Sequence, residues 1–280
     1  MLQAAFRVNQ FQCGTMRICC LSIFAGVAAL YLLEGAEPPP RQVGPTSQPP
    51  SANTRTDRAS GYEMRQIEGW EIQIHRDLLT QERTGTEKAL ELLRLQLAEI
   101  VRVVPSAAVA KLREVRLWFS PESPGVKPSA EYHPARGWLN ANHRNPAMAK
   151  GVEFTNIRDF EKETKRMPNF ALHELAHAFH DRVLGFKHPE IKAAYERAKA
   201  GKLYESVERW HGDGRLNTRE RSYAMTDEKE YFAENTEAFF SRNDFFPFTR
   251  QELEKHDPEM FALLQRLWNL PAAEKAANSQ

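Results

Sequence analysis

The sequence has few cysteines and no excess of charge of either sign. All three cysteines lie before residue 21, so the rest of the 280-residue chain can form no internal disulfide. Lys and Arg total 38 against 37 for Asp and Glu, which leaves a formal charge of +1, and no block rich in Lys and Arg occurs. We therefore expect no nucleic-acid partner, because such a partner requires a concentrated basic surface.

Long hydrophobic runs are also scarce, and the main one lies near the N-terminus. Residues 18–33 are almost continuously apolar and follow two arginines, which is typical of an export signal, but the run falls short of the roughly 20 residues of a full membrane span. We predict a signal peptide or membrane anchor over 1–36, with the protein secreted or held at the outer face of a membrane. Residues 37–60, rich in Pro, Ser and Thr, are predicted to be a disordered linker. The domain itself is expected over 61–280, as a monomer.

The spacing of apolar residues predicts a mixed α+β fold. Strict alternation favours strands over 70–75 and 115–119, and two further extended segments are expected at 137–142 and 151–157. Apolar residues at helical spacing predict the following helices: 86–104, 167–184 with Gly185 as its stop, 189–200, 227–241 and 258–270. The second half of the domain is therefore expected to be mainly helical.

The most informative motif is the run His173-Glu174-Leu175-Ala176-His177 inside the predicted helix 167–184. Residues four apart on a helix share one face, so both imidazoles can reach one metal ion, while Glu174 points to a neighbouring sector and can act as a base. A catalytic zinc commonly has three protein ligands, so one more is required. His180 is a poor choice, because three ligands on one straight helix hardly surround an ion, and we expect it to have a capping or outer-shell role.

A row of carboxylates offers a better third ligand. Glu230, Glu234 and Glu237 recur at i, i+4 and i+7 of the predicted helix 227–241. Taken alone, such a row is usually a solvated acidic face. Beside a helix that carries two histidines, however, we expect Glu230 or Glu234 to bind the metal.

The wider pattern resembles a known family. The HExxH motif, Tyr223, six intervening residues and then Glu230-Tyr231-Phe232-Ala233-Glu234 resemble the metallopeptidase domain of anthrax toxin lethal factor and the related Pro-Pro endopeptidases, over about 152–240. The resemblance implies a zincin-like fold, with a small mixed sheet packed on the HExxH helix. It also implies one Zn2+ ion with His173, His177 and Glu230 as ligands, Glu174 as the base and Tyr223 as a stabiliser of the oxyanion.

These roles have a chemical basis. Zinc with such ligands lowers the pKa of bound water toward about 7, and Glu174 can take the water proton and later deliver it to the leaving amine. Negative charge then gathers on the carbonyl oxygen, where the Tyr223 hydroxyl can stabilise it. A metal-bound histidine usually donates its second nitrogen to a carboxylate; Glu234 is the candidate for this second-shell support, ahead of Glu237.

The substrate is expected to be a peptide or protein. Alternation over 152–156 is typical of a half-buried edge strand, which could pair with an extended peptide, or of a strand already paired on both sides. We predict a zinc-dependent metallopeptidase. A zinc amidase of cell-wall peptide and a non-catalytic surface protein stabilised by zinc are the alternatives, although the latter has no need of Glu174 or Tyr223. Cobalt or manganese can occupy similar ligand sets.

Overall fold

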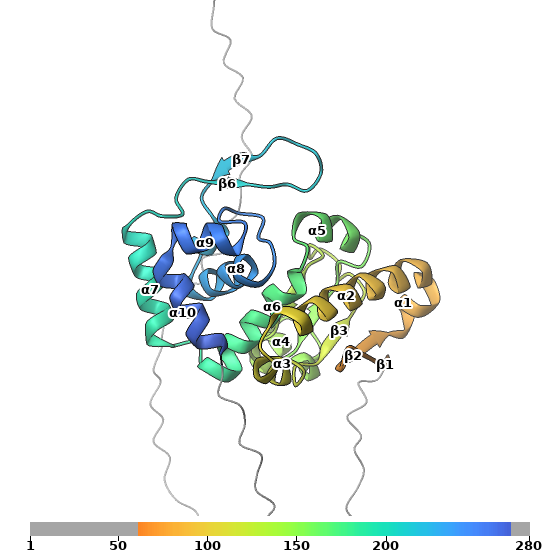
Figure 1. Ribbon diagram of the computed structural model, residues 1–280. Helices are drawn as coiled ribbons and strands as arrows, with labels where there is room; N and C mark the ends of the chain where they lie inside the picture. Colours follow the sequence, from red (N-terminus) through yellow and green to blue (C-terminus); the bar gives the residue numbers. More distant parts are fainter. Residues whose placement is uncertain (1–60, 270–280) are drawn as a thin grey trace, which may run out of the picture. The chain divides into compact units, whose positions relative to one another are not determined.

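The computed structural model describes residues 61–269, which contain a five-stranded sheet, a small hairpin and the helices α1 to α10 (Figure 1). The fold is mixed α+β with a mainly helical C-terminal half, as the sequence predicts. The predicted signal or anchor over 1–36 and the linker over 37–60 lie outside the described residues, and the single domain over 61–280 stays a prediction. Among the residues that the structure describes, no helix is both long and apolar enough to cross a membrane.

The main sheet has the strand order β1-β2-β3-β5-β4. Its strands are β1 (Tyr62–Ile67), β2 (Trp70–His75), β3 (Leu117–Phe119), β5 (Val152–Phe154) and β4 (Ala130–Tyr132). The inner pairs β2/β3 and β3/β5 are parallel, whereas the outer pairs β1/β2 and β5/β4 are antiparallel. The strands predicted over 70–75, 115–119 and 151–157 are confirmed, the last two in shorter form.

The register divides the sheet into an apolar face and a mixed face. One row of opposed residues runs Ile72, Leu117, Val152 and Tyr132, and the next runs Ile74, Phe119, Phe154 and Ala130. Most of these side chains are fully buried in the main core, which also includes the apolar side of α6 (Phe170–Phe179). Because side chains alternate along a strand, Trp118 and Glu153 occupy the opposite face.

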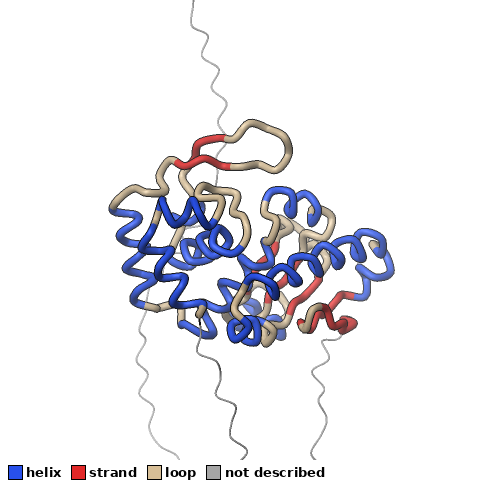
Figure 2. The backbone as a smooth tube through the Cα atoms, viewed as in Figure 1, coloured by secondary structure: helices blue, strands red, loops and turns tan. Residues whose placement is uncertain are grey.

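The helices account for most of the remaining chain (Figure 2). Besides α6, their bounds are α1 (Arg76–Gln81), α2 (Arg83–Val103), α3 (Ser106–Leu112), α4 (Arg136–Ala141), α5 (Phe160–Arg166), α7 (Pro189–Ala200), α8 (Glu228–Phe240), α9 (Arg250–His256) and α10 (Pro258–Trp268). Short 3-10 turns cover Pro146–Met148 and Tyr223–Met225, and the hairpin consists of β6 (Val207–Arg209) and β7 (Thr218–Glu220). The predicted helices over 86–104, 189–200, 227–241 and 258–270 are confirmed as α2, α7, α8 and α10.

The helix with the HExxH motif is shorter than its apolar pattern predicts. α6 ends at Phe179 and continues as a π-helical turn, His180–Leu184, before Gly185 reverses the chain with a φ of 81°. A side chain is disfavoured at such a positive φ, so glycine suits the stop position. α6 lies against α8, and α10 covers both where Trp268 stacks on Phe179 with ring centroids 4.1 Å apart. This apolar contact holds the two site-bearing helices together.

One strand prediction is wrong, and the structure decides between the two alternatives left open for another strand. Residues 137–142 lie largely in helix α4, where only Leu139 is buried while Trp138 remains 46% exposed, so the segment lacks the alternating apolar face of a strand. Of the two alternatives for 152–156, the strand paired on both sides is the one found, because β5 pairs with β3 on one side and with β4 on the other. The edge strand next to β5 is β4, whose three residues are too few to show a period.

Candidate metal centre

Two imidazoles converge from one turn of α6. Asn169 caps this helix by accepting a hydrogen bond from the Leu172 amide at 3.1 Å, and Leu172, Leu175 and Ala176 anchor its apolar side in the core. The opposite side presents His173 and His177, whose Nε2 atoms lie 3.1 Å apart. Both histidines of the motif therefore face one point, as the i, i+4 spacing predicts.

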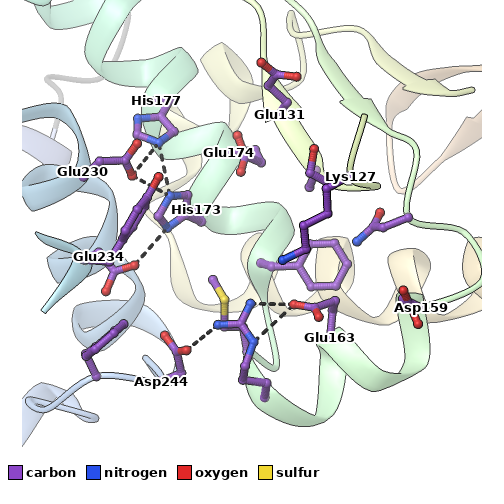
Figure 3. A pocket seen from close by; sticks show the side chains of 18 of the residues that line it. Lys127, Glu131, Asp159, Glu163, His173, Glu174, His177, Glu230, Glu234 and Asp244 are labelled. Carbon is purple, nitrogen blue, oxygen red and sulfur yellow. Dashed lines mark hydrogen bonds and ion pairs between the residues drawn. The ribbon is translucent and has the colours of Figure 1, made fainter. Parts of the chain in front are cut away.

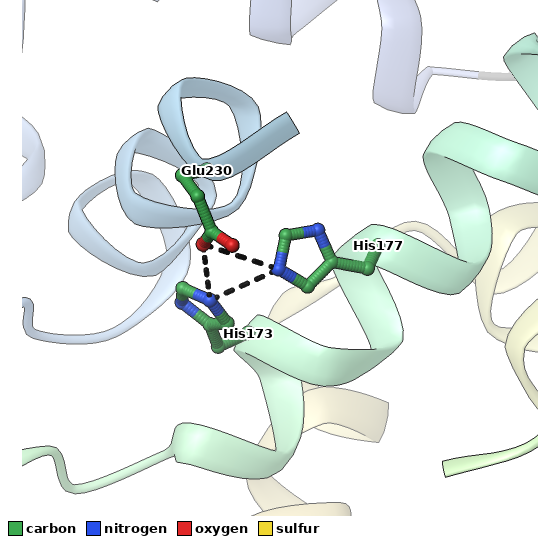
Figure 4. A group of neighbouring side chains, drawn as sticks. All are labelled: His173, His177 and Glu230. Atoms are coloured by element: carbon green, nitrogen blue, oxygen red, sulfur yellow. Dashed lines mark hydrogen bonds and ion pairs between the residues drawn. The ribbon is translucent and has the colours of Figure 1, made fainter. Parts of the chain in front are cut away.

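A carboxylate from α8 completes the group (Figure 4). Asp227 caps α8 by accepting hydrogen bonds from the amides of Lys229 and Glu230, which fixes the first turn of the helix. Glu230 then places its Oε2 atom 3.1 Å from the Nε2 of His173 and 3.3 Å from the Nε2 of His177. Of the two carboxylates that the sequence offers as ligands, the structure brings Glu230 to the histidine pair.

The spacing of these three atoms fits a zinc ion. Bonds of about 2.0–2.1 Å at tetrahedral angles set neighbouring donor atoms about 3.3 Å apart. The three separations here are 3.1, 3.1 and 3.3 Å. The described residues thus contain a His/His/Glu group with the geometry and donor types of a metal site.

The charges around the group favour a cation. Burial alone would raise the pKa of the Glu230 carboxyl, but hydrogen bonds with His173 and His177 hold this pKa well below its usual range. Burial would likewise lower the pKa of His173, but hydrogen bonds to Glu230 and Glu237 hold it well above its ordinary value. The carboxylates therefore stabilise positive charge at this point, and a divalent metal ion would supply it.

The outer support of His173 differs from the sequence prediction. Its Nδ1 lies 2.6 Å from Oε1 of Glu237, so with Nε2 turned to the metal position Nδ1–H donates to that carboxylate. Glu234, the predicted partner, stays 3.8 Å away and accepts a hydrogen bond from Asn243 Nδ2 at 3.1 Å instead. Both carboxylates lie on the buried side of α8, and the orientation of the helix brings Glu237 to the imidazole. Burial raises the pKa of Glu237 to about 7.

Glu174 lies beside the donor group without belonging to it (Figure 3). Its Oε2 accepts a hydrogen bond from the backbone amide of Tyr132 at 2.8 Å. The hydroxyl of Tyr132 in turn donates to Oδ2 of Asp181 in the π-helical turn at 2.7 Å. The edge strand β4 is thus tied to the metal-binding helix at two points, and one of them orients the predicted base.

Tyr223 lines the same cleft from the 3-10 turn that precedes α8. Tyr223 is half exposed. The turn is capped by the Ser222 side chain, whose Oγ accepts a hydrogen bond from the Ala224 amide. Burial and then the charge of Glu230 raise the pKa of Tyr223 to about 12. The phenol is therefore protonated at neutral pH and able to donate a hydrogen bond.

The cleft has a volume of about 920 Å³, and several parts of the chain line it. These are β4 with the loop before it, α5, α6, the base of the β6–β7 hairpin, the 3-10 turn with Tyr223, and α8 with the loop after it. Two arginines brace the far wall: Arg166 pairs with Glu163 at 2.5 Å and with buried Asp244, and Arg209 pairs with Glu220 at 3.0 Å. The hairpin loop touches α5 so closely that a side chain at Gly212 would lie 2.6 Å from the Arg166 backbone nitrogen. No local sequence signal links these residues, which meet only in the folded chain.

His180 is the C-cap residue of α6, and its backbone amide donates to the Ala176 carbonyl, but its side chain makes no capping or outer-shell contact within the described part of the chain. Its side chain is fully buried against Phe186 and Phe232, and neither ring nitrogen has a hydrogen-bond partner among the described residues. Burial, followed by the positive charges of His177, His188 and Lys229, lowers its pKa to about 4. The ring therefore stays neutral in the folded protein, and unpaired buried nitrogens cost stability.

We expect this burial to make the fold sensitive to acid. In the unfolded chain the histidine has a pKa near 6.5, whereas in the folded protein the pKa of His180 is about 4. Between these values only the unfolded chain binds the proton, so stability is lost as the pH falls from about 6.5 toward 4. At pH 5 the loss from this one group is about 2 kcal/mol. The free energy of unfolding is measured in urea, with chelator present, at pH 7 and at pH 5. The decrease between these two pH values should be about 2 kcal/mol smaller for His180→Leu than for the wild type. His211→Leu, on the hairpin loop, is the control, and an equal loss in His180→Leu and wild type would contradict the assignment.

Comparison with known proteins gives one match. Residues 148–267 match the model of a family described as anthrax toxin lethal factor, N- and C-terminal domain. The matched segment is less than half of the chain, but it contains His173, Glu174, His177, Tyr223 and Glu230. Neither the curated proteins nor the solved structures contain a match. The part of the chain that holds the candidate metal centre is thus similar to this family.

Proposed function

We propose that this protein is a zinc-dependent metallopeptidase. The observation that carries the proposal is the triangle of His173, His177 and Glu230, whose donor atoms have the separations that tetrahedral zinc requires. Glu174 stands next to this triangle, outside the ligand set, and opens onto a cleft large enough for a peptide. A purely structural zinc site would need neither the free carboxylate nor the open side.

The residues divide the chemistry between them. His173, His177 and Glu230 would hold the zinc ion, which would act as a Lewis acid that lowers the pKa of water toward about 7 and polarises a substrate carbonyl. Glu174, held by the Tyr132 amide, takes a proton from the attacking water and delivers it to the leaving amine. The protonated Tyr223 hydroxyl donates a hydrogen bond to the carbonyl oxygen as negative charge develops there. Glu237 keeps the proton of His173 on Nδ1, which leaves Nε2 free for the metal.

The edge strand β4 is the proposed place for the peptide. Its inner side pairs with β5, while the Tyr132 amide points away from β5 toward Glu174. Because backbone groups alternate in direction along an antiparallel strand, those of Ala130 point outward as well. An extended peptide can hydrogen-bond to this edge and lie across the cleft beside the base. Export of the domain to the outer side of a membrane, through the segment 1–36, belongs to the same proposal.

Metal content and substrate profile test the proposal together. Purified full-length protein and His177→Ala are assayed for bound zinc, then incubated with a peptide library, with denatured proteins and with peptidoglycan fragments. We expect about one zinc per wild-type chain, cleavage of peptides, loss of cleavage with chelator and recovery with added zinc. The His177→Ala variant should bind little metal and cleave nothing.

The thermal midpoint separates catalysis from a structural role. The contact between α6 and α8 rests on buried apolar residues such as Phe179, Phe232 and Trp268, so chelation should lower the midpoint only modestly. Unfolding of the domain on chelation, with no cleavage at any zinc concentration, would favour a structural zinc. Release of fragments from peptidoglycan alone would favour an amidase.

A further inference from the structure

Two carboxylates face each other across the pair β4/β5. Glu131 lies directly opposite Glu153 in the antiparallel register, so both side chains project from the same face of the sheet, the face turned away from α6. Like charges in directly opposed positions destabilise a sheet unless other groups compensate them. The neighbours of each carboxylate therefore show how this pair is tolerated.

All of the direct compensation goes to Glu153. This residue is 2% exposed, accepts a hydrogen bond from Nε2 of His133 at 2.9 Å and pairs with the guanidinium of Arg144. His133 is itself held by stacking on Trp138, with ring centroids 5.8 Å apart. In consequence the pKa of Glu153 is lowered, although burial alone would raise it.

Glu131 has no such partner. Among the described residues, no side chain or amide donates a hydrogen bond to its carboxylate, and no cation lies within ion-pair distance of it. The residue is half-buried, and burial is the main reason that its pKa is raised; Glu174 and Glu153 add to this, while His133 and Arg144 oppose it. The side chain nevertheless lines the cleft, as Glu174 does (Figure 3).

The position of Glu131 on the edge strand determines what can reach it. A peptide that pairs with the free edge of β4 places one side chain directly opposite Glu131, on the same face and with Cβ atoms about 4.5–5.5 Å apart. The row would then read Glu153, Glu131 and the substrate residue. A basic substrate side chain in this position would give Glu131 the partner that Glu153 obtains from Arg144.

We propose that Glu131 selects substrates with a lysine or arginine at the position that pairs with it on β4. This inference rests on the proposed function, since it requires a peptide in the cleft. The selected residue lies close to the scissile bond, because Tyr132, the next residue of β4, contacts the base Glu174 through its amide. A neutral residue in that place would leave the Glu131 carboxylate without a partner, and an acidic residue would add a second unpaired carboxylate beside it.

Sequencing of cleavage products tests this inference. Wild type, Glu131→Gln, Glu131→Lys and the control Glu196→Lys, an exposed residue of α7, digest one peptide library, and residue frequencies are counted at each position around the cut. We expect wild type to favour Lys and Arg over Gln by about tenfold at one position, as for a charge-assisted pair. Glu131→Gln should abolish this preference, and Glu131→Lys should replace it with a preference for Asp and Glu. Glu196→Lys should match wild type.

The outcomes distinguish this inference from the proposed function. Cleavage without a basic preference at any position, or with a basic preference that survives Glu131→Lys, would overturn the role of Glu131 and leave the peptidase proposal standing. A wild-type protein that binds zinc and cleaves no peptide would overturn both. Circular dichroism melting curves of the variants check that each is folded, which is expected because the Glu131 side chain holds no other part of the protein in place.

Discussion

Replacement of Glu174 by Gln is expected to remove hydrolysis and leave metal binding intact. Glutamine has the shape of glutamate, and its carbonyl oxygen can still accept the hydrogen bond from the Tyr132 amide, so the local structure should persist. It cannot take a proton from water, however, and loss of a general base costs about 10²- to 10⁴-fold in rate. The change should appear in kcat, because Glu174 acts on the reacting water and not on peptide affinity.

The measurement compares kcat, KM and zinc content of Glu174→Gln with those of wild type and of Glu254→Gln. Glu254 is an exposed residue of α9, so its replacement makes the same chemical change away from the cleft. Zinc content should be equal in all three proteins, because Glu174 is outside the His173, His177 and Glu230 group. Full activity of Glu174→Gln would show that another group is the base and would remove the proposed mechanism.

Long periodic segments could be predicted from the sequence. The α2, α7, α8 and α10 helices appear where apolar residues recur at helical spacing, and β2 appears where Trp70, Ile72 and Ile74 alternate with polar residues. In these segments the spacing of apolar residues within the segment itself indicates which side is buried. The same holds for the two histidines of the metal group, because i, i+4 spacing on α6 fixes both imidazoles before any tertiary contact forms.

Short elements and the contacts between distant segments could not be predicted. β4 has three residues, and only its pairing with β5 makes it a strand. The choice between Glu234 and Glu237 depends on how α8 is rotated against α6, and four or seven residues along a helix both return to nearly the same face. Likewise no sequence spacing links His133, which lies in the loop after β4, to Glu153; only the fold brings them together.

The three carboxylates of α8 should respond to replacement by Gln in a fixed order. Glu230→Gln should cause the largest loss, more than about 100-fold in zinc affinity and in kcat/KM, because its Oε2 is one of the three converging donor atoms. Glu237→Gln should cost about 10- to 100-fold, the usual effect of removing an outer-shell carboxylate from a metal-bound histidine. Glu234→Gln should change little, because burial raises the pKa of Glu234 and an amide resembles the neutral acid.

Zinc competition with a chelating indicator, together with kcat/KM on one peptide, measures all three variants on the same scale. Each variant replaces a carboxylate by an amide of equal size on the same helix, so every variant serves as the control for the other two. Glu234 and Glu237 lie 3.8 and 2.6 Å from Nδ1 of His173, so only Glu237 is expected to support this histidine. Equal losses in Glu234→Gln and Glu237→Gln would contradict this and would mean that both carboxylates do so. A loss in Glu234→Gln larger than that in Glu230→Gln would assign the third ligand to Glu234, the alternative that the sequence alone leaves open.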